Sequence, residues 1–94
     1  MQKYLVFTDH AERRMFKRSV SRDEVREVLL RGEVIQEYPD DTPWPARLML
    51  AWVGGRPLHV VAADAPPKET TFVITAYEPD PQRWNDDFTE KRKK

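Results

Sequence analysis

Apolar and polar residues near the N-terminus follow the period of a helix. Ala11 and Met15 lie four positions apart among polar and charged neighbours, which predicts a helix over residues 10–18 that packs through this apolar stripe. Asp9 stands directly before this segment and is a favourable N-cap residue. Residues 4–8 are short and apolar, so they predict either a brief strand or an extended lead-in to the helix.

A second helix is marked at both of its ends. Ser21 and Glu24 have the spacing of a capping box in which Ser21 is the N-cap, and Gly32 is a residue type that ends helices. Between them, three apolar residues recur at helical spacing and predict the buried face of this helix, namely Val25, Val28 and Leu29.

Beyond this helix the pattern changes to short apolar or alternating stretches, which are typical of strands. The predicted strands are residues 33–38, 47–53, 57–63 and 71–77. Gly54-Gly55 predicts a two-residue hairpin turn between the second and third strands, and the proline-rich segments 39–45 and 64–69 predict loops. We therefore expect one α+β domain over residues 1–94, with two N-terminal helices packed on one face of an antiparallel sheet of about four strands.

The hairpin turn sets which face of the sheet carries His59. If Gly54 and Gly55 are the two turn residues, His59 pairs with Leu50 and shares its face with other large apolar residues, so it belongs to the core. A one-residue bulge near Pro57 would instead move His59 to the opposite face. The sequence leaves both alternatives open.

The last predicted strand separates apolar from polar side chains. Phe72, Ile74 and Ala76 alternate along one face and are expected in the core, whereas Thr75 and Tyr77 lie on the other face. Tyr77 is therefore either a residue that presents its hydroxyl or its ring to a ligand, or an ordinary tyrosine at the rim of the sheet. The chain then ends in a short amphipathic or frayed tail, whose Trp84 we expect to act as a hydrophobic plug.

Composition excludes several classes of protein. The chain has no cysteine, which excludes a disulfide framework, a thiolate zinc site and a cysteine nucleophile and fits a reducing compartment. No apolar stretch approaches the roughly 18 residues that span a bilayer, and the N-terminal residues are too short and mixed for a secretory signal. Histidines and acids show no metal-ligand spacing. We expect a cytoplasmic protein with no membrane partner, no metal and no cofactor.

The strongest chemical signal lies on the first predicted helix. His10, Arg14 and Arg18 are spaced by four residues and line up along one face, with two more cations beside that row, Arg13 and Lys17. Such a face suits a phosphate, because the cations hold the anion while the imidazole transfers a proton near neutral pH. The alternative is a solvated basic face that Glu12 partly neutralises. The net charge of the chain is zero, so any attraction for nucleic acid is local.

The sequence contains one further histidine, His59. Two proton-transfer groups and arginines are sufficient for metal-free RNA cleavage, in which the 2′-hydroxyl of the RNA is the nucleophile. The protein then supplies a general base, a general acid and cations that stabilise the charge-rich transition state. The alternative is that His59 is an ordinary half-buried histidine in an apolar strand and has no catalytic role.

Three segments together resemble a known bacterial family. They are His-Ala-x-x-Arg-Met-x-x-Arg at residues 10–18, Gly-Arg-Pro-Leu-His-Val-Val at 55–61, and Val-Ile-Thr-Ala-Tyr-Glu-Pro-Asp-Pro-x-x-Trp at 73–84. In this order they resemble the family catalogued as domain of unknown function 4258. Ala76 departs from the family pattern, which more often has a β-branched residue before the tyrosine.

The resemblance carries expectations of fold, function and partners. The family is considered similar to RelE-like and colicin-like ribonuclease toxins and, more loosely, to BrnT toxins. It implies a small toxin that cleaves RNA and is held inactive by an antitoxin of zinc-finger or helix-turn-helix type. The site residues that it implies are His10, Arg14, Arg18, His59 and Tyr77, with Thr75 nearby.

We therefore expect a metal-independent endoribonuclease of the toxin–antitoxin type. His10 acts as general base or acid, Arg14 and Arg18 hold the scissile phosphate, Arg13 or Lys17 bind flanking phosphates, and His59 or Tyr77 is the second proton carrier. One alternative is a non-catalytic module that binds RNA or an acidic protein segment with the same face. Another is an interaction domain whose edge strand at residues 33–38 pairs with a partner.

Overall fold

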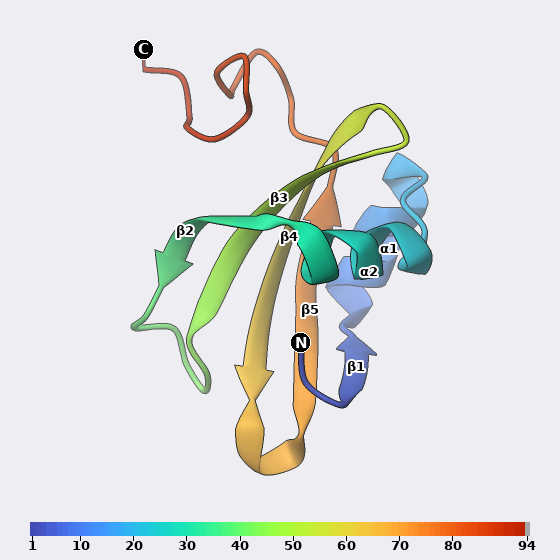
Figure 1. Cartoon of the computed structure of the whole chain (residues 1–94), viewed down its shortest axis with the longest axis vertical. Helices are drawn as coiled ribbons and strands as arrows, with labels where there is room; N and C mark the ends of the chain where they lie inside the picture. The colour runs from blue at the N-terminus through green and yellow to red at the C-terminus, as the bar shows by residue number, and fades with distance from the viewer. Residues whose placement is uncertain (94) are drawn as a thin grey trace.

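Five strands form one mixed sheet in the order β1-β5-β4-β3-β2 (Figure 1). The computed structural model describes residues 1–93. Its strands are β1 (Tyr4–Phe7), β2 (Glu33–Tyr38), β3 (Ala46–Val53), β4 (Arg56–Ala65) and β5 (Thr70–Tyr77), and its helices are α1 (Asp9–Arg18), α2 (Arg22–Arg31) and the short 3₁₀ helix η1 (Pro66–Lys68). The expected α+β class, with two helices near the N-terminus, is confirmed. No helix among residues 1–93 is long and apolar enough to cross a membrane.

The predicted meander is present, and one more strand joins it. Strands β2 to β5 pair antiparallel in sequence order. Strand β1 pairs parallel to β5, with Tyr4 opposite Thr70 and Phe7 opposite Val73. The sheet is therefore mixed and has five strands, and the segment before α1 is a strand. The expectation of a purely antiparallel four-stranded sheet is corrected in this respect.

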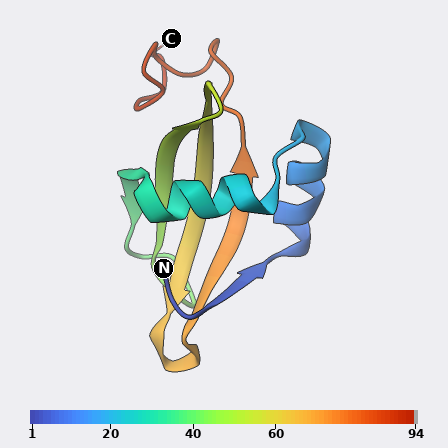
Figure 2. The same ribbon diagram turned by 45° about the vertical axis from the view of Figure 1, so that its right-hand side comes forward.

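The two helices pack on the sheet at different places. Helix α2 crosses in front of β3 and β4, while α1 stands beside β5 near the edge formed by β1 (Figure 2). Between helices and sheet lies the main apolar core, which includes Ala11, Met15, Val25, Val28, Met49, Leu58, Val60, Ala62, Val73 and Ala76. The buried stripes predicted for both helices are thus confirmed.

Helix α1 begins one residue earlier than the sequence predicts. Thr8, and not Asp9, is the N-cap, because the Thr8 hydroxyl accepts a hydrogen bond from the Ala11 amide at 3.1 Å. The same hydroxyl donates to the carbonyl of Ile74, and the Thr8 amide donates to that of Val73. Pairing with β5 therefore fixes the conformation of Thr8. Asp9 becomes the first helical residue, where its carboxylate still interacts favourably with the helix dipole.

Helix α2 has the capping box that its sequence predicts. The Ser21 hydroxyl accepts from the Glu24 amide, and the Glu24 carboxylate accepts from the Ser21 amide. The helix ends against β3 at Gly32, where space is limiting. A Cβ atom at this position would lie 2.4 Å from the carbonyl oxygen of Val28 and 2.8 Å from that of Leu50.

The hairpin between β3 and β4 has the predicted turn and register. Gly54 and Gly55 have φ angles of +59° and +84°, which suit a tight two-residue turn. Leu50 pairs with His59, and the register continues without a bulge near Pro57. The register of the first of the two alternatives for His59 is therefore correct, and His59 is buried, but on the face of the sheet opposite the helices and outside the main apolar core.

A bulge in β5 changes the predicted faces of that strand. Val61 pairs with Thr75 and Ala62 with Val73, so Ile74 is an additional residue between them. Phe72 pairs with Ala63 on the face away from α2, and only Ala76 of the predicted trio lies in the core against the helices. The prediction that Phe72, Ile74 and Ala76 share one core face is therefore wrong.

The segment after β5 covers the end of the face opposite the helices. Its Trp84 is buried, and its ring meets that of His59 edge-on with centroids 4.4 Å apart. The Trp52 and Phe88 rings also meet edge-on. The segment turns back on itself through a bridge between Trp84 and Lys91. Trp84 is thus the hydrophobic plug that the sequence predicts, and His59 lies beneath it.

Candidate functional site

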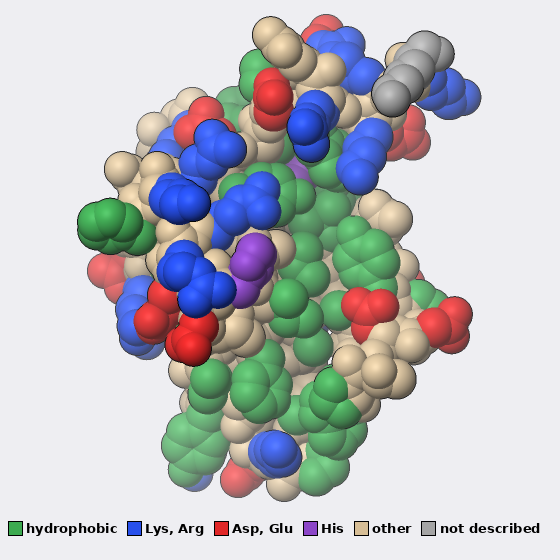
Figure 3. Space-filling view, turned by 180° about the vertical axis from the view of Figure 1, so that it is seen from behind, with side chains coloured by type: hydrophobic (Ala, Val, Ile, Leu, Met, Phe, Trp, Pro, Cys, Tyr) green, Lys and Arg blue, Asp and Glu red, His purple; other side chains and the backbone are tan. Residues whose placement is uncertain are grey.

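The basic row of α1 faces solvent at the edge of the sheet. His10, Arg13, Arg14 and Lys17 surround a cavity of about 120 Å³. His10, Arg13, Lys17 and Arg18 are exposed, whereas Arg14 is half-buried. In the view from behind, Lys and Arg side chains gather around a histidine beside an apolar area (Figure 3). The cations thus stand close together without an equal number of acids among them.

A larger cavity of about 390 Å³ adjoins the first one and is lined by Arg14, Arg18, Tyr77, Glu78, Asp80, Arg83, Trp84 and Lys91. Its cations come from α1 and from the segment after β5. The Arg14 guanidinium carbon lies 4.8 Å from the centroid of the Tyr77 ring, a cation–π contact that fixes the position of this arginine. Arg14 is thus the residue shared by the cavity that His10 lines and the cavity that Tyr77 lines.

Behind Tyr77 lies the buried His59. The Nε2 atom of His59 is 2.8 Å from the carbonyl oxygen of Phe88, and Nδ1 is 3.3 Å from the hydroxyl oxygen of Tyr77. A carbonyl only accepts, so Nε2 donates to Phe88, and in the neutral imidazole Nδ1 accepts from the Tyr77 hydroxyl. His59 is fully buried and both of its ring nitrogens are occupied. Tyr77 and Trp84, which both contact His59, separate it from the cavity.

Burial decides the protonation of this pair. Loss of solvent lowers the pKa of His59, although the hydrogen bond to Phe88 opposes that shift. Loss of solvent raises the pKa of Tyr77, and the Arg14 guanidinium acts in the opposite direction. Tyr77 is therefore a phenol and His59 a neutral imidazole at neutral pH. The 3.3 Å contact between them is long for an O–H donor, so the Tyr77 proton is loosely held.

Arg56 positions α1 against the rest of the site. Its guanidinium donates to the carbonyl oxygens of Arg18 at 3.3 Å and Ser19 at 2.7 Å, and to the carboxylates of Glu24 at 3.0 Å and Glu78 at 3.3 Å. The C-terminal end of α1 is thereby attached to α2 and to the residue that follows Tyr77. Arg56 belongs to the segment 55–61 that carries the family resemblance, but the sequence did not indicate its role, since its partners are distant along the chain.

The same contacts shift the pKa of both charged partners. The backbone amide of Ser21 and then the Arg56 guanidinium lower the pKa of Glu24, and hydrogen bonding to Glu24 raises that of Arg56. Both side chains are about one-quarter exposed, at 25% and 27%, so solvent screens this ion pair only in part. Glu24 therefore acts twice, as the capping-box partner of α2 and as the anchor of Arg56.

Thr75 lies on the same face of the sheet as Tyr77 and pairs with Val61. Its hydroxyl oxygen is buried and has no hydrogen-bond partner among residues 1–93. The structure thus groups Thr75 with Tyr77, as predicted, although Thr75 lines neither of the two basic cavities. No cluster of three or more metal-ligating side chains occurs in the described part of the chain.

Residues 7–78 match the model of the family described as Domain of unknown function (DUF4258). The chain belongs to this family. No curated protein and no solved structure matches it significantly. The DUF4258 match includes His10, Arg14, His59 and Tyr77, whereas Arg83, Trp84 and Lys91 lie beyond it. The sequence did not mark Arg83 and Lys91 as site residues, because only the folded C-terminal segment brings them to the cavity.

Proposed function

We propose that this protein is a metal-independent endoribonuclease of the toxin–antitoxin type. One observation carries the proposal: Arg14 lines both the cavity of the exposed imidazole of His10 and the cavity of the Tyr77 phenol, whose ring it contacts. A phosphate on Arg14 would have a proton acceptor on one side and a proton donor on the other. In-line displacement at phosphorus needs that arrangement, because the attacking and leaving oxygens lie on opposite sides of the phosphate.

The proposed reaction uses the 2′-hydroxyl of the RNA as nucleophile. His10 takes the proton of this hydroxyl. The 2′-oxygen then attacks phosphorus, and the bond between phosphorus and the 5′-oxygen breaks. Tyr77 gives its proton to the departing 5′-oxygen, which requires its hydroxyl to turn away from His59. Arg14 and Arg18 stabilise the charge that develops on the phosphate, and Arg13 and Lys17 bind flanking phosphates.

We assign the second proton transfer to Tyr77 and make His59 a positioning residue. His59 is fully buried, its Nε2 atom donates to Phe88 and its Nδ1 atom accepts from Tyr77. With a pKa lowered by burial, it is also a poor reservoir for a proton. The toxin role and the antitoxin of zinc-finger or helix-turn-helix type rest on the resemblance of the family to RelE-like and BrnT-like toxins, and the proposed cytoplasmic location rests on the composition of the chain.

The test is RNA cleavage in excess chelator by the parent protein and by matched variants. We expect His10→Ala to lose about 10²–10⁴-fold in rate, the usual contribution of a proton-transfer group, and Arg14→Ala to be comparably impaired. The control is Arg26→Ala on α2, since Arg26 is 54% exposed and lies 3.7 Å from Asp23. An unchanged rate in either site variant removes that residue from the mechanism.

The second candidate function is a non-catalytic module that binds RNA. The exposure of His10 favours it, because water reaches the imidazole and burial does not fix its orientation. This function predicts phosphate binding without turnover and little effect of pH between 5 and 8.

Strand addition has a structural basis as well, since β2 is an edge strand whose Val34 is exposed.

A further inference from the structure

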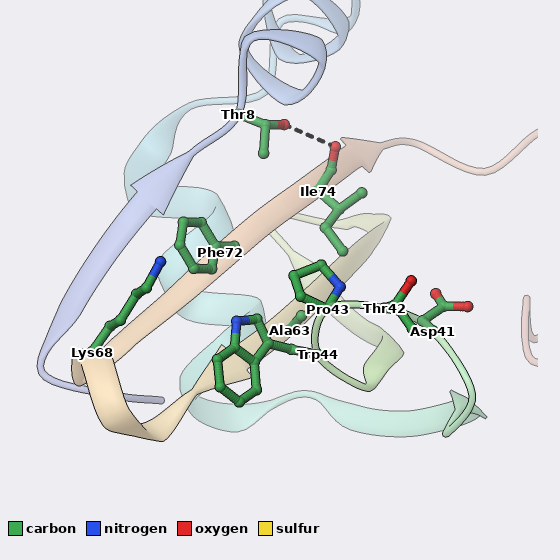
Figure 4. Close-up of a pocket in the computed structure, with 9 residues that line it drawn as sticks. All are labelled: Thr8, Asp41, Thr42, Pro43, Trp44, Ala63, Lys68, Phe72 and Ile74. Atoms are coloured by element: carbon green, nitrogen blue, oxygen red, sulfur yellow. Dashed lines mark hydrogen bonds between the residues drawn. The ribbon is translucent and has the colours of Figure 1, made fainter.

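A third cavity opens on the face of the sheet away from α2 (Figure 4). Its volume is about 380 Å³, which lies in the range of small-molecule sites. Phe72 and Ile74 line it from β5, and Pro43 and Trp44 line it from the loop between β2 and β3. Phe72 and Ile74 reach it because the bulge turns this part of β5 away from the helical core. The cavity thus presents two aromatic rings, which are suited to stack on a planar ligand.

The cavity lies next to the basic row of α1. Thr8 lines it and is the N-cap of α1, two residues before His10. Ile74 lines it three residues before Tyr77, about 10 Å along an extended strand. A hydrogen bond from the Thr8 hydroxyl to the Ile74 carbonyl joins the two elements at 3.1 Å. A ligand that fills the cavity therefore has the cations of α1 within reach.

Polar groups complete the lining. Lys68 comes from η1, and Asp41 and Thr42 come from the loop between β2 and β3. Figure 4 shows Lys68 on the side of Phe72, and Asp41 and Thr42 on the other side of Pro43. An ammonium suits a phosphate, while a carboxylate and a hydroxyl suit the amino and imino groups at the edge of a base. The chemistry fits a planar heterocycle attached to an anion better than a purely aliphatic ligand.

We propose that this cavity binds one unstacked nucleobase of the RNA, adjacent to the phosphate held by Arg14. The inference rests on the proposed function and extends it, since it places the base that the enzyme recognises. Stacking on Phe72 and Trp44 supplies most of the binding, and Asp41 and Thr42 distinguish between bases. The site would thus cleave RNA next to an exposed base and not within a duplex, where bases are stacked.

The test is an NMR titration of the full chain with the four nucleoside 3′-monophosphates and with inorganic phosphate. We expect at least one nucleotide to bind about 5- to 150-fold more tightly than phosphate, the range that stacking of one base supplies. Binding of this nucleotide should shift protein signals at two sites, one at Phe72 and Trp44 and the other at Arg14 and Tyr77. Phosphate alone should shift the signals of Arg14 and Tyr77 and leave those of the Phe72 and Trp44 rings unchanged.

Two variants and one control test the role of the rings. Phe72→Leu and Trp44→Leu should each lower the advantage of the nucleotide over phosphate and leave phosphate binding unchanged. Leucine keeps apolar bulk, so folding is preserved, and circular dichroism checks this for each variant. Phe16→Leu is the control, because Phe16 is 88% exposed on α1 and lines neither the base cavity nor the phosphate site.

The outcomes separate this inference from the proposed function. Equal affinity for nucleotides and phosphate, with shifts only at Arg14 and Tyr77, overturns the base site and leaves the phosphate site in place. Nucleotide shifts at Phe72 and Trp44 without any at Arg14 support the base site and contradict the proposed function. Unchanged nucleotide affinity in both cavity variants also overturns the base site.

Discussion

Replacing Arg56 by alanine should destabilise the fold more than the loss of any ordinary surface arginine. The guanidinium of Arg56 contacts the Ser19 carbonyl at 2.7 Å and both carboxylate oxygens of Glu24 at 3.0 and 3.1 Å. Hydrogen bonds to charged groups contribute about 1.5–3 kcal/mol each when they are well protected. Because Arg56 and Glu24 are about one-quarter exposed, screening reduces the sum. We expect a loss of about 2 kcal/mol in the free energy of unfolding.

The assay is urea denaturation followed by circular dichroism, together with thermal melting. For a chain of this length, about 2 kcal/mol corresponds to a fall in Tm of roughly 8–16 °C. Arg26→Ala is the matched control and should change the stability by less than about 0.5 kcal/mol, as is usual for exposed positions. If Arg56→Ala is as stable as Arg26→Ala, the view that Arg56 attaches α1 to the sheet is refuted.

The pH dependence gives an independent check of the same contact. The folded-state pKa of Glu24 lies below its unfolded value of about 4.5, so the contribution of the ion pair is present above pH 4.5. It is lost as the pH falls through the folded-state pKa. The stability difference between parent and Arg56→Ala should therefore shrink in acid. A difference that stays constant from pH 7 to pH 3 would show that Glu24 is not the main partner.

Two further predictions concern residues on either side of the sheet. Gly32→Ala should lower the free energy of unfolding by about 1–3 kcal/mol in urea titrations, because the added Cβ would lie 2.4 Å and 2.8 Å from the backbone oxygens of Val28 and Leu50 and would force the backbone to shift. A change below about 0.5 kcal/mol would contradict this packing. Burial lowers the folded-state pKa of His59 below its unfolded value of about 6.5, so the parent should lose stability as the pH falls below 6.5. His59→Gln should reduce this slope in melts between pH 7.5 and pH 5, and an identical slope would show that His59 does not stay neutral in the fold.

Local signals in the sequence were sufficient for much of the fold. The Ser21 and Glu24 capping box, the Gly54-Gly55 turn and the pairing of His59 with Leu50 each depend on residues close together in the chain. Their geometry follows from short-range hydrogen bonding and from the backbone freedom of glycine. The capping box and the turn were predicted from the sequence and the structure confirms them, whereas the pairing of His59 was one of two alternatives that the sequence left open.

Features that depend on distant residues were missed. The parallel pairing of β1 with β5 joins residues 66 positions apart, such as Tyr4 and Thr70, and no local pattern specifies it. The bulge at Ile74 reverses the side on which Phe72 lies, because a single extra residue changes the face of a strand. Thr8 and not the predicted Asp9 is the N-cap of α1 for a related reason, because hydrogen bonds to β5 hold Thr8 in place.

The candidate site likewise combines a feature that local spacing predicts with features that depend on residues distant in the chain. The row of His10, Arg14 and Arg18 follows from helical spacing alone, and the structure brings Arg14 and Arg18 into one cavity with Tyr77. The burial of His59 under Trp84 was outside the reach of sequence patterns, because it requires the C-terminal segment to fold back. That segment also decides which of the two candidate proton carriers faces the cavity.

The central claim is that His10, Arg14 and Tyr77 form a metal-free RNA-cleaving site, and the ends of the RNA products test it most directly. Purified protein is incubated with RNA and with intact ribosomes in excess chelator, beside the His10→Ala variant. Attack by the 2′-hydroxyl predicts 2′,3′-cyclic phosphate and 5′-hydroxyl ends from the parent and intact RNA from the variant. Intact RNA with the folded parent on both substrates, or 5′-phosphate ends, would contradict the claim.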